Sequence, residues 1–120
     1  MKVLLVCDVP WVRNQVQAAL SGSHEIVSVR DPYDAEVVAV AEAADLAIVD
    51  MQVGSMGGMA ITRALKGASP GVGPIVLLLD RRADAFIAKR AGADAWLLKP
   101  FTAQELRSVL ASVIPLGVER

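Results

Sequence analysis

The chain has 120 residues, a formal net charge of −1, and a composition that is 54% hydrophobic but only 4% aromatic. This length fits one compact domain, residues 1–120, with residues 116–120 as a tail or the start of a linker. The balanced charge argues against a basic surface that binds nucleic acid directly. The single cysteine excludes an internal disulfide, and no apolar run is long enough to span a membrane. We therefore expect a cytoplasmic domain.

Short apolar runs alternate along the chain with longer segments of helical periodicity. The apolar runs predict five buried strands, at Lys2–Cys7, Glu25–Val29, Leu46–Asp50, Ile75–Leu79 and Ala95–Leu98. The intervening segments predict helices that begin at Pro10, span Ala35–Ala44, Met59–Lys66 and Arg82–Ala91, and begin again after Thr102. Five strand–helix repeats of this kind predict a parallel sheet with helices on both faces.

Local signals predict where several of these helices begin and end. Pro10 suits a first helical position, where its missing N–H is not needed. Gly92 suits the position just past a helix C-terminus. Thr102, with Glu105 three residues on, forms a capping-box pattern. Helix and strand boundaries are therefore marked most clearly in the last third of the chain.

Charged residues stand at the ends of four predicted strands. Asp8 follows the first strand, Asp50 ends the third, Asp80 follows the fourth, and Lys99 follows the fifth. Open α/β sheets bind ligands at the carboxyl ends of their strands. Neighbouring carboxylates attract a hard divalent cation, and a lysine complements a phosphoryl group. The pattern therefore predicts a site for a cation and a phosphoryl group at this edge of the sheet.

A charged residue at a strand end can also have a purely structural role. The roles of Cys7 and His24, two other residues with reactive side chains, must be considered as well. Asp80 taken alone fits a turn or helix cap. Cys7 adjoins a carboxylate, which raises the pKa of a thiol, so we expect it to be unreactive. His24 is the only histidine and has no suitable partner nearby in sequence, so we assign it no catalytic or metal-binding role. The joint placement of Asp8, Asp50 and Lys99 favours a functional site.

Three motifs carry a resemblance to a known family. They are Asp8 after the first strand, Asp50-Met51 followed by Met56-Gly57-Gly58, and the run GADAWLLKPF at 92–101. With these motifs the chain resembles the response-regulator receiver family over essentially its whole length. The resemblance implies a (βα)5 flavodoxin-like three-layer sandwich with strand order 2-1-3-4-5. It also implies a signalling domain of a two-component system rather than an enzyme.

The resemblance further implies a role for each site residue. Asp50 is expected to accept a phosphoryl group from a histidine kinase. Asp8, Asp50 and the main-chain carbonyl of Gln52 are expected to hold Mg²⁺, which we expect to bind weakly. Lys99 is expected to contact the phosphoryl oxygens, and the Lys99–Pro100 peptide bond to be cis.

Several residues depart from the pattern of the family, among them Gly54-Ser55 and Gly57 after the phospho-acceptor. Cys7 replaces the first of two adjacent acids, which removes one charge from the cation site. Leu79 stands where a Thr or Ser hydroxyl usually follows the phosphoryl group, and Asp80 adds a possible extra acid beside it. Trp96 occupies the aromatic switch position and is larger than the usual Tyr or Phe. These departures put the switch in doubt more than the phospho-acceptor.

Two functions therefore stay open at this point. One is a response regulator in a phosphorelay, phosphorylated on Asp50. The other is an atypical pseudo-receiver that acts through phosphorylation-independent protein contact or dimerisation. A small flavodoxin-like enzyme or nucleotide binder is disfavoured, because Cys7–Trp11 lacks the glycines of a phosphate-binding loop. The resemblance places partner contacts, including a possible homodimer, on the face of the fourth helix, fifth strand and fifth helix.

Overall fold

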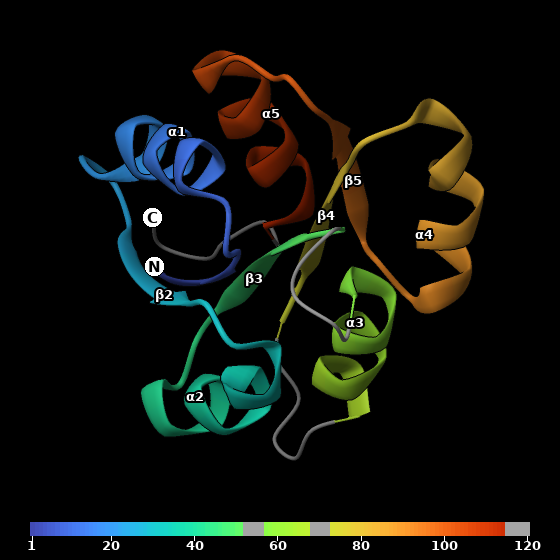
Figure 1. Cartoon of the computed structure of the whole chain (residues 1–120). Helices are drawn as coiled ribbons and strands as arrows, with labels where there is room; N and C mark the ends of the chain where they lie inside the picture. Colours follow the sequence, from blue (N-terminus) through green and yellow to red (C-terminus); the bar gives the residue numbers. More distant parts are fainter. Residues whose placement is uncertain (52–56, 68–72, 115–120) are drawn as a thin grey trace.

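The fold is a five-stranded parallel sheet between two layers of helices (Figure 1). The computed structural model describes residues 1–51, 57–67 and 73–114. Its strands are β1 (Lys2–Val6), β2 (Glu25–Val29), β3 (Leu46–Asp50), β4 (Ile75–Leu79) and β5 (Ala95–Leu98). They lie in the order β2-β1-β3-β4-β5, which confirms the predicted topology.

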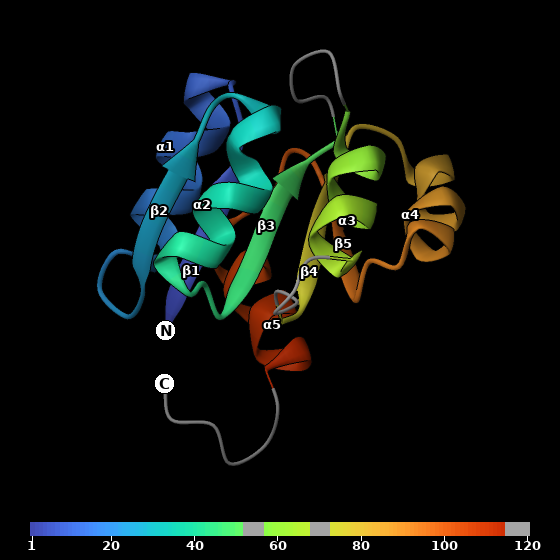
Figure 2. The same ribbon diagram turned by 90° about the horizontal axis from the view of Figure 1, so that it is seen from below.

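Within the described residues, five α-helices and two short 3₁₀ turns connect and follow the strands. The helices are α1 (Pro10–Leu20), α2 (Ala35–Glu42), α3 (Gly58–Gly67), α4 (Ala85–Ala91) and α5 (Ala103–Val113), and the 3₁₀ turns are η1 (Pro32–Asp34) and η2 (Arg82–Asp84). Helices α1 and α5 cover one face of the sheet, and α2, α3 and α4 cover the other (Figures 1 and 2). None of the described helices is long and apolar enough to cross a lipid bilayer.

The sheet divides the interior into two apolar clusters. One cluster, under α1 and α5, contains residues such as Leu5, Ile48 and Leu78. The other, under α2, α3 and α4, contains Val49, Leu77 and Leu79. Every residue of β3 and β4 is buried, as expected for central parallel strands covered on both faces. The continuous apolar runs of the sequence therefore correspond to the middle of the sheet.

The predicted helix signals are found where the sequence placed them. Pro10 is the first residue of α1. Gly92 caps α4 with a φ of 98°, a left-handed conformation that glycine adopts without strain. The Thr102 side chain accepts from the Glu105 main-chain N–H, and the Glu105 side chain accepts from the Thr102 N–H, which completes the capping box.

Some predicted boundaries are wrong by a few residues. The first strand ends at Val6 rather than Cys7. The Cys7 N–H still donates to the Val29 carbonyl, but the Cys7 thiol already bonds to the main chain of Val9, just before α1 begins. The helix predicted over Arg82–Ala91 is divided. Its first turn is the 3₁₀ turn η2, and regular α-helix begins only at Ala85.

Candidate functional site

Asp50 ends β3 and is fully buried at the carboxyl edge of the sheet. Its Oδ1 lies 2.6 Å from Lys99 Nζ, and its Oδ2 lies 3.6 Å from the Cys7 thiol sulfur, which donates to it. A buried carboxylate is costly to desolvate unless it is paired and hydrogen-bonded. Asp50 has both kinds of partner, the Lys99 ammonium and the Cys7 thiol, which offset the cost of burying its carboxylate.

Lys99 follows β5 and contacts two carboxylates at once. Its Nζ lies 2.6 Å from Asp50 Oδ1 and 3.0 Å from Asp80 Oδ1, and its main-chain N–H donates to the Leu79 carbonyl. Burial alone would lower the pKa of Lys99, but the hydrogen bonds to Asp50 and Asp80 outweigh burial and raise it. The side chain is therefore a fixed ammonium ion directed at Asp50.

Asp80 reaches Lys99 because of the register between β4 and β5. Leu79 pairs with Leu98, so the next residue of each strand, Asp80 and Lys99, lies at the same level of the edge. The residue that caps η2 is Arg81, and it makes no side-chain capping bond. The Asp80 carboxylate therefore lies beside Lys99 at this edge of the sheet and does not cap η2.

Cys7 brings a neutral hydrogen-bond donor to the site. Its sulfur lies 3.4 Å from the carbonyl oxygen of Val9 and accepts from the Val9 N–H. Burial, together with the charges of Asp50 and Asp8, raises the pKa of the thiol to about 11. The thiol therefore stays protonated at neutral pH and adds no negative charge for a cation.

Asp8 lies at the same edge as Asp50. It follows β1, which pairs in parallel with β3 with Val6 opposite Val49, and it is exposed. The expected third ligand, the carbonyl of Gln52, lies outside the described residues. Within the described ranges, no three His, Cys, Asp or Glu side chains are grouped so as to hold a metal ion. Of the Mg²⁺ ligands expected from the sequence, the described residues thus include the carboxylates of Asp8 and Asp50.

Leu79 and Trp96 lie in the apolar cluster under α2, α3 and α4. Leu79 is buried there, and Trp96, which pairs with Leu77 in the sheet, packs against the same cluster and is partly buried. The position of the usual hydroxyl is therefore part of the core.

The Lys99–Pro100 peptide bond is cis.

Gly58 positions the start of α3 against Asp50, a role that the sequence analysis did not assign. A Cβ at this position would lie 2.8 Å from both the Asp50 carbonyl oxygen and the Met51 Cα. The Gly58 N–H donates to the Met51 carbonyl. The two adjacent glycines at 57–58 could have indicated this role from the sequence. Gly57, with a φ of 78°, forms the turn that brings Gly58 close to Asp50.

His24 lies far from this edge of the sheet, because it precedes β2 and so stands at the amino ends of the strands. Burial lowers its pKa. A hollow of about 180 Å³ lies beside it, lined also by Leu20 and Arg107. Its position gives it no contact with the Asp50 site.

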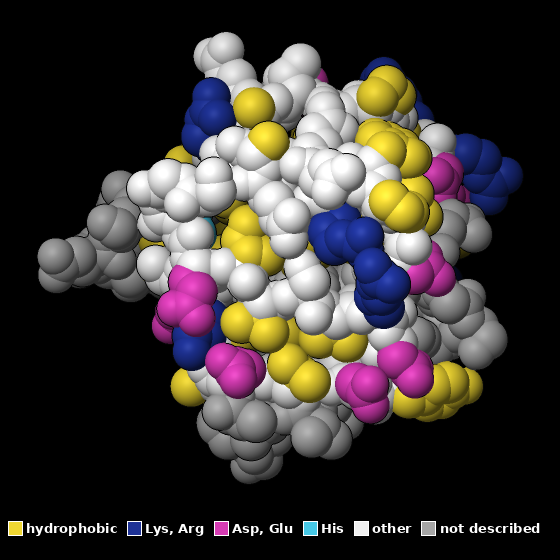
Figure 3. Space-filling view, turned by 60° about the vertical axis from the view of Figure 1, so that its left-hand side comes forward, with side chains coloured by type: hydrophobic (Ala, Val, Ile, Leu, Met, Phe, Trp, Pro, Cys, Tyr) yellow, Lys and Arg dark blue, Asp and Glu magenta, His cyan; other side chains and the backbone are white. Residues whose placement is uncertain are grey.

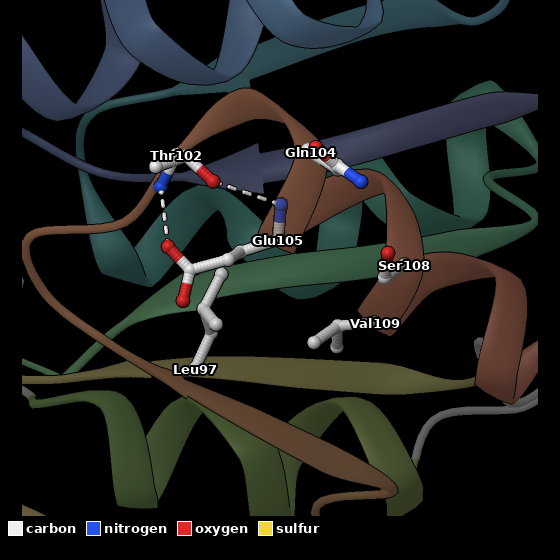
Figure 4. A pocket seen from close by; sticks show the side chains of 6 residues that line it. All are labelled: Leu97, Thr102, Gln104, Glu105, Ser108 and Val109. Atoms are coloured by element: carbon white, nitrogen blue, oxygen red, sulfur yellow. Dashed lines mark hydrogen bonds between the residues drawn. The ribbon is translucent and has the colours of Figure 1, made fainter.

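A larger hollow of about 360 Å³ lies between β5 and α5 and does not include the Asp50 site (Figure 4). Its lining is mixed, with apolar Leu97 and Val109 beside polar Ser108 and the Thr102–Glu105 capping box. On the face that carries α1 and β2, Lys and Arg side chains are interspersed with Asp and Glu side chains and with apolar patches (Figure 3). The described part of that face thus presents no single basic field.

The sequence model of the response regulator receiver domain matches residues 3–111. The chain belongs to this family. Among curated proteins, the probable transcriptional regulators ycf27 of Porphyridium aerugineum and Cyanophora paradoxa are 26% and 28% identical to this chain, each over 116 residues. These matches cover 94% of this chain and 48% of each relative, so the chain spans about half the length of those proteins.

Solved receiver structures share both the fold and part of the sequence. The chemotaxis response regulator CheY4 of Vibrio cholerae is 28% identical, with a TM-score of 0.86 over 94% of this chain and 98% of that one. The BeF3-activated N-terminal receiver domain of RstA from Klebsiella pneumoniae is 29% identical, with a TM-score of 0.84 over 94% and 97%. The receiver domain of the sensor histidine kinase PA1611 from Pseudomonas aeruginosa, described with magnesium in its active site cleft, is 26% identical, with a TM-score of 0.83 over 93% and 95%.

Proposed function

We propose that this receiver domain is a cytoplasmic signalling module that accepts a phosphoryl group on Asp50 from a histidine kinase. The observation that supports the proposal best is the contact between Lys99 Nζ and Asp50 Oδ1, at 2.6 Å. A carboxylate nucleophile beside a fixed ammonium ion suits phosphoryl transfer, because the ammonium offsets the charge of the incoming group. The domain acts as a regulator rather than as an enzyme.

The transfer proposed here is a displacement at phosphorus. A carboxylate oxygen of Asp50 attacks the phosphorus of the phosphohistidine and forms an acyl phosphate bond. The P–N bond breaks, and its electron pair stays on the imidazole nitrogen, which takes up a proton. The Lys99 ammonium, which contacts Asp50 before transfer, is then within reach of the new phosphoryl group.

Asp8 and Asp50 supply two carboxylates for a Mg²⁺ ion. Cys7, which replaces a further acid of the family pattern, supplies only a protonated thiol, so we expect binding to be weak. When bound, the cation would neutralise charge on the phosphoryl oxygens. We propose these two residues and the Gln52 carbonyl as its ligands, with a Kd of about 1 mM or weaker. Cys7→Asp is expected to tighten Mg²⁺ binding, measured by titration of Trp fluorescence, whereas Asp8→Ala is expected to abolish it.

A partner is proposed to bind the face formed by α4, β5 and α5. Phe86 and Ile87 of α4 are large apolar side chains that are exposed there. The hollow between β5 and α5 is lined in part by the apolar side chains of Leu97 and Val109 (Figure 4). Exposed apolar side chains on α4 and a partly apolar hollow between β5 and α5 suit a protein contact, with another signalling protein or with a second copy of the chain.

The proposed phosphorylation can be tested with acetyl phosphate as the donor and Mg²⁺ present. Intact-mass spectrometry is expected to show one added phosphoryl group on the wild type and none on Asp50→Asn. Asp50→Asn is a matched control, because it keeps the shape of the side chain and removes the nucleophile. Equal modification of both proteins would place the chemistry elsewhere.

The second candidate function is contact without phosphorylation, and three features of the site favour it. Leu79 provides no hydroxyl, Cys7 provides no charge, and Asp80 already occupies Lys99. If the wild type gains no mass with acetyl phosphate and Mg²⁺, and Asp50→Asn does not alter partner binding, this second function replaces the first.

A further inference from the structure

Lys99 is shared between two carboxylates before any phosphoryl group arrives. Asp50 Oδ1 and Asp80 Oδ1 lie 2.6 Å and 3.0 Å from the same Nζ atom. The Asp50 and Lys99 side chains are 0% and 7% exposed, whereas the Asp80 side chain is 40% exposed. Asp80 therefore stands on the solvent side of the buried pair.

The charges of this group do not cancel. Two carboxylates and one ammonium leave a net charge of −1. Phosphorylation replaces the −1 charge of the Asp50 carboxylate with the charge of about −1.5 to −2 of a phosphoryl group, so the group gains about 0.5 to 1 further negative charge. The phosphoryl group needs the ammonium that Asp80 now contacts, and it must approach this ammonium close to the like charge of the Asp80 carboxylate. Asp80 thus competes with the phosphoryl group for Lys99 and also repels it.

We propose that Asp80 is a positioning residue that restrains phosphorylation of Asp50 by holding Lys99 and repelling an anionic phosphoryl group. This inference rests on the proposed function of Asp50 as phospho-acceptor. In the unmodified protein, Asp80 Oδ1 accepts from Lys99 Nζ as a phosphoryl oxygen would. Lys99 must give up this contact, at least in part, when Asp50 is modified. The restraint is modest, because water and salt screen a carboxylate that is 40% exposed.

An opposite role would give an effect of opposite sign. If Asp80 served only to orient Lys99 toward Asp50, its removal would leave the ammonium less well placed, and phosphorylation would slow. If Asp80 restrains the site, its removal frees the ammonium and removes the repulsion, and phosphorylation accelerates. The direction of the change in rate therefore separates the two roles.

The test compares the wild type with Asp80→Asn, Asp80→Glu and Glu25→Gln. Glu25 begins β2 at the opposite edge of the sheet and is exposed, so Glu25→Gln makes the same change in net charge away from the site. The rate of modification by acetyl phosphate with Mg²⁺ is followed by intact-mass spectrometry at low and high salt. Asp80→Asn is expected to react about fivefold faster at low salt, with a smaller advantage at high salt. Asp80→Glu and Glu25→Gln are expected to resemble the wild type.

Each outcome decides between the inference and the function on which it rests. Modification of Asp80→Asn at the wild-type rate or more slowly overturns the inference and leaves the proposed function intact. If Asp80→Asn is modified and the wild type is not, the inference is supported, and the wild type has the contact-only function. No modification of either protein overturns both. The Lys99 pKa, measured by NMR, is expected to fall in Asp80→Asn, since Asp80 raises it in the wild type.

Discussion

Two lysine–aspartate pairs stand at opposite ends of β5, each with an N–O distance of 2.6 Å. At the amino end, Lys66 of α3 contacts Asp94, and their side chains are 34% and 38% exposed. At the carboxyl end, Lys99 contacts Asp50, and their side chains are 7% and 0% exposed. The two pairs share a distance and differ in their surroundings.

The difference separates an exposed structural contact from a buried contact at the proposed phosphorylation site. Asp94 Oδ2 also accepts from the Ile75 N–H at 2.8 Å, so the exposed pair ties α3 to the start of β4. An exposed ion pair contributes little to stability, whereas a buried pair becomes costly once one partner is removed. A buried pair is a weak way to stabilise a fold, so its presence at the carboxyl edge is better explained by chemistry.

The largest expected effect is that of Lys99→Met. It leaves the Asp50 carboxylate buried without its ammonium partner, and we expect the free energy of unfolding to fall by about 4 kcal/mol at neutral pH. Urea unfolding followed by circular dichroism measures this change. Adding Asp50→Asn to Lys99→Met is expected to recover much of the loss, because the buried negative charge disappears. A loss below about 1 kcal/mol would mean that the pair is effectively solvated.

The second effect is a pH dependence that comes from Cys7. The folded-state pKa is raised from 9.0 to about 11, so the folded protein keeps a proton that the unfolded chain releases. The resulting stabilisation is complete below pH 9 and is lost as the pH rises toward 11. A two-unit shift corresponds to about 2 to 3 kcal/mol.

The measurement is the unfolding free energy of the wild type and of Cys7→Ala across this pH range. Lys99 titrates in both proteins, so the difference between the two curves isolates the thiol. Cys7→Ala is expected to give the flatter curve between pH 9 and 11. Parallel curves would show that the thiol is no harder to ionise in the folded protein than in the unfolded one.

A third, smaller effect concerns the switch. Leu79 cannot donate a hydrogen bond to a phosphoryl oxygen, and Trp96 is already packed against the apolar cluster that contains Leu79. We therefore expect the site and Trp96 to be coupled by less than about 1 kcal/mol. Beryllofluoride should leave the NMR shifts around Trp96 nearly unchanged in the wild type and should change them more in Leu79→Thr. A large change at Trp96 in the wild type would contradict this expectation.

The smallest effect is expected at the exposed pair. Lys66→Met removes the ammonium from Asp94 but leaves its hydrogen bond from the Ile75 N–H, so stability should fall by about 0.5 kcal/mol. The same urea experiment gives the value, with Lys99→Met as the matched comparison. If both variants lost equal stability, burial would not be what distinguishes the two pairs.

The fold could be predicted from the sequence because its signals are local. The continuous apolar runs at 46–50 and 75–79 predict central strands, and Gly92 and the Thr102–Glu105 capping box predict helix ends. The first turn of the segment Arg82–Ala91 could not be assigned as 3₁₀, because helical periodicity does not distinguish it from α-helix.

The site could be predicted only in part, because contacts across the sheet depend on register. The joint position of Asp50 and Lys99 at one edge follows from strand order. That Lys99 is shared with Asp80, and that the Cys7 thiol donates to Asp50, depends on side-chain distances that spacing along the chain does not contain. The close approach of Gly58 to Asp50 likewise requires the position of α3 in space.

The central claim is that Asp50 is the residue that carries the phosphoryl group, and the most direct measurement locates the modification. After treatment with acetyl phosphate and Mg²⁺, borohydride reduces an acyl phosphate of aspartate to homoserine, which peptide mapping can place in the sequence. The account predicts homoserine at position 50 and unmodified aspartate at positions 8 and 80. Homoserine at either of those positions, or at none, would contradict it.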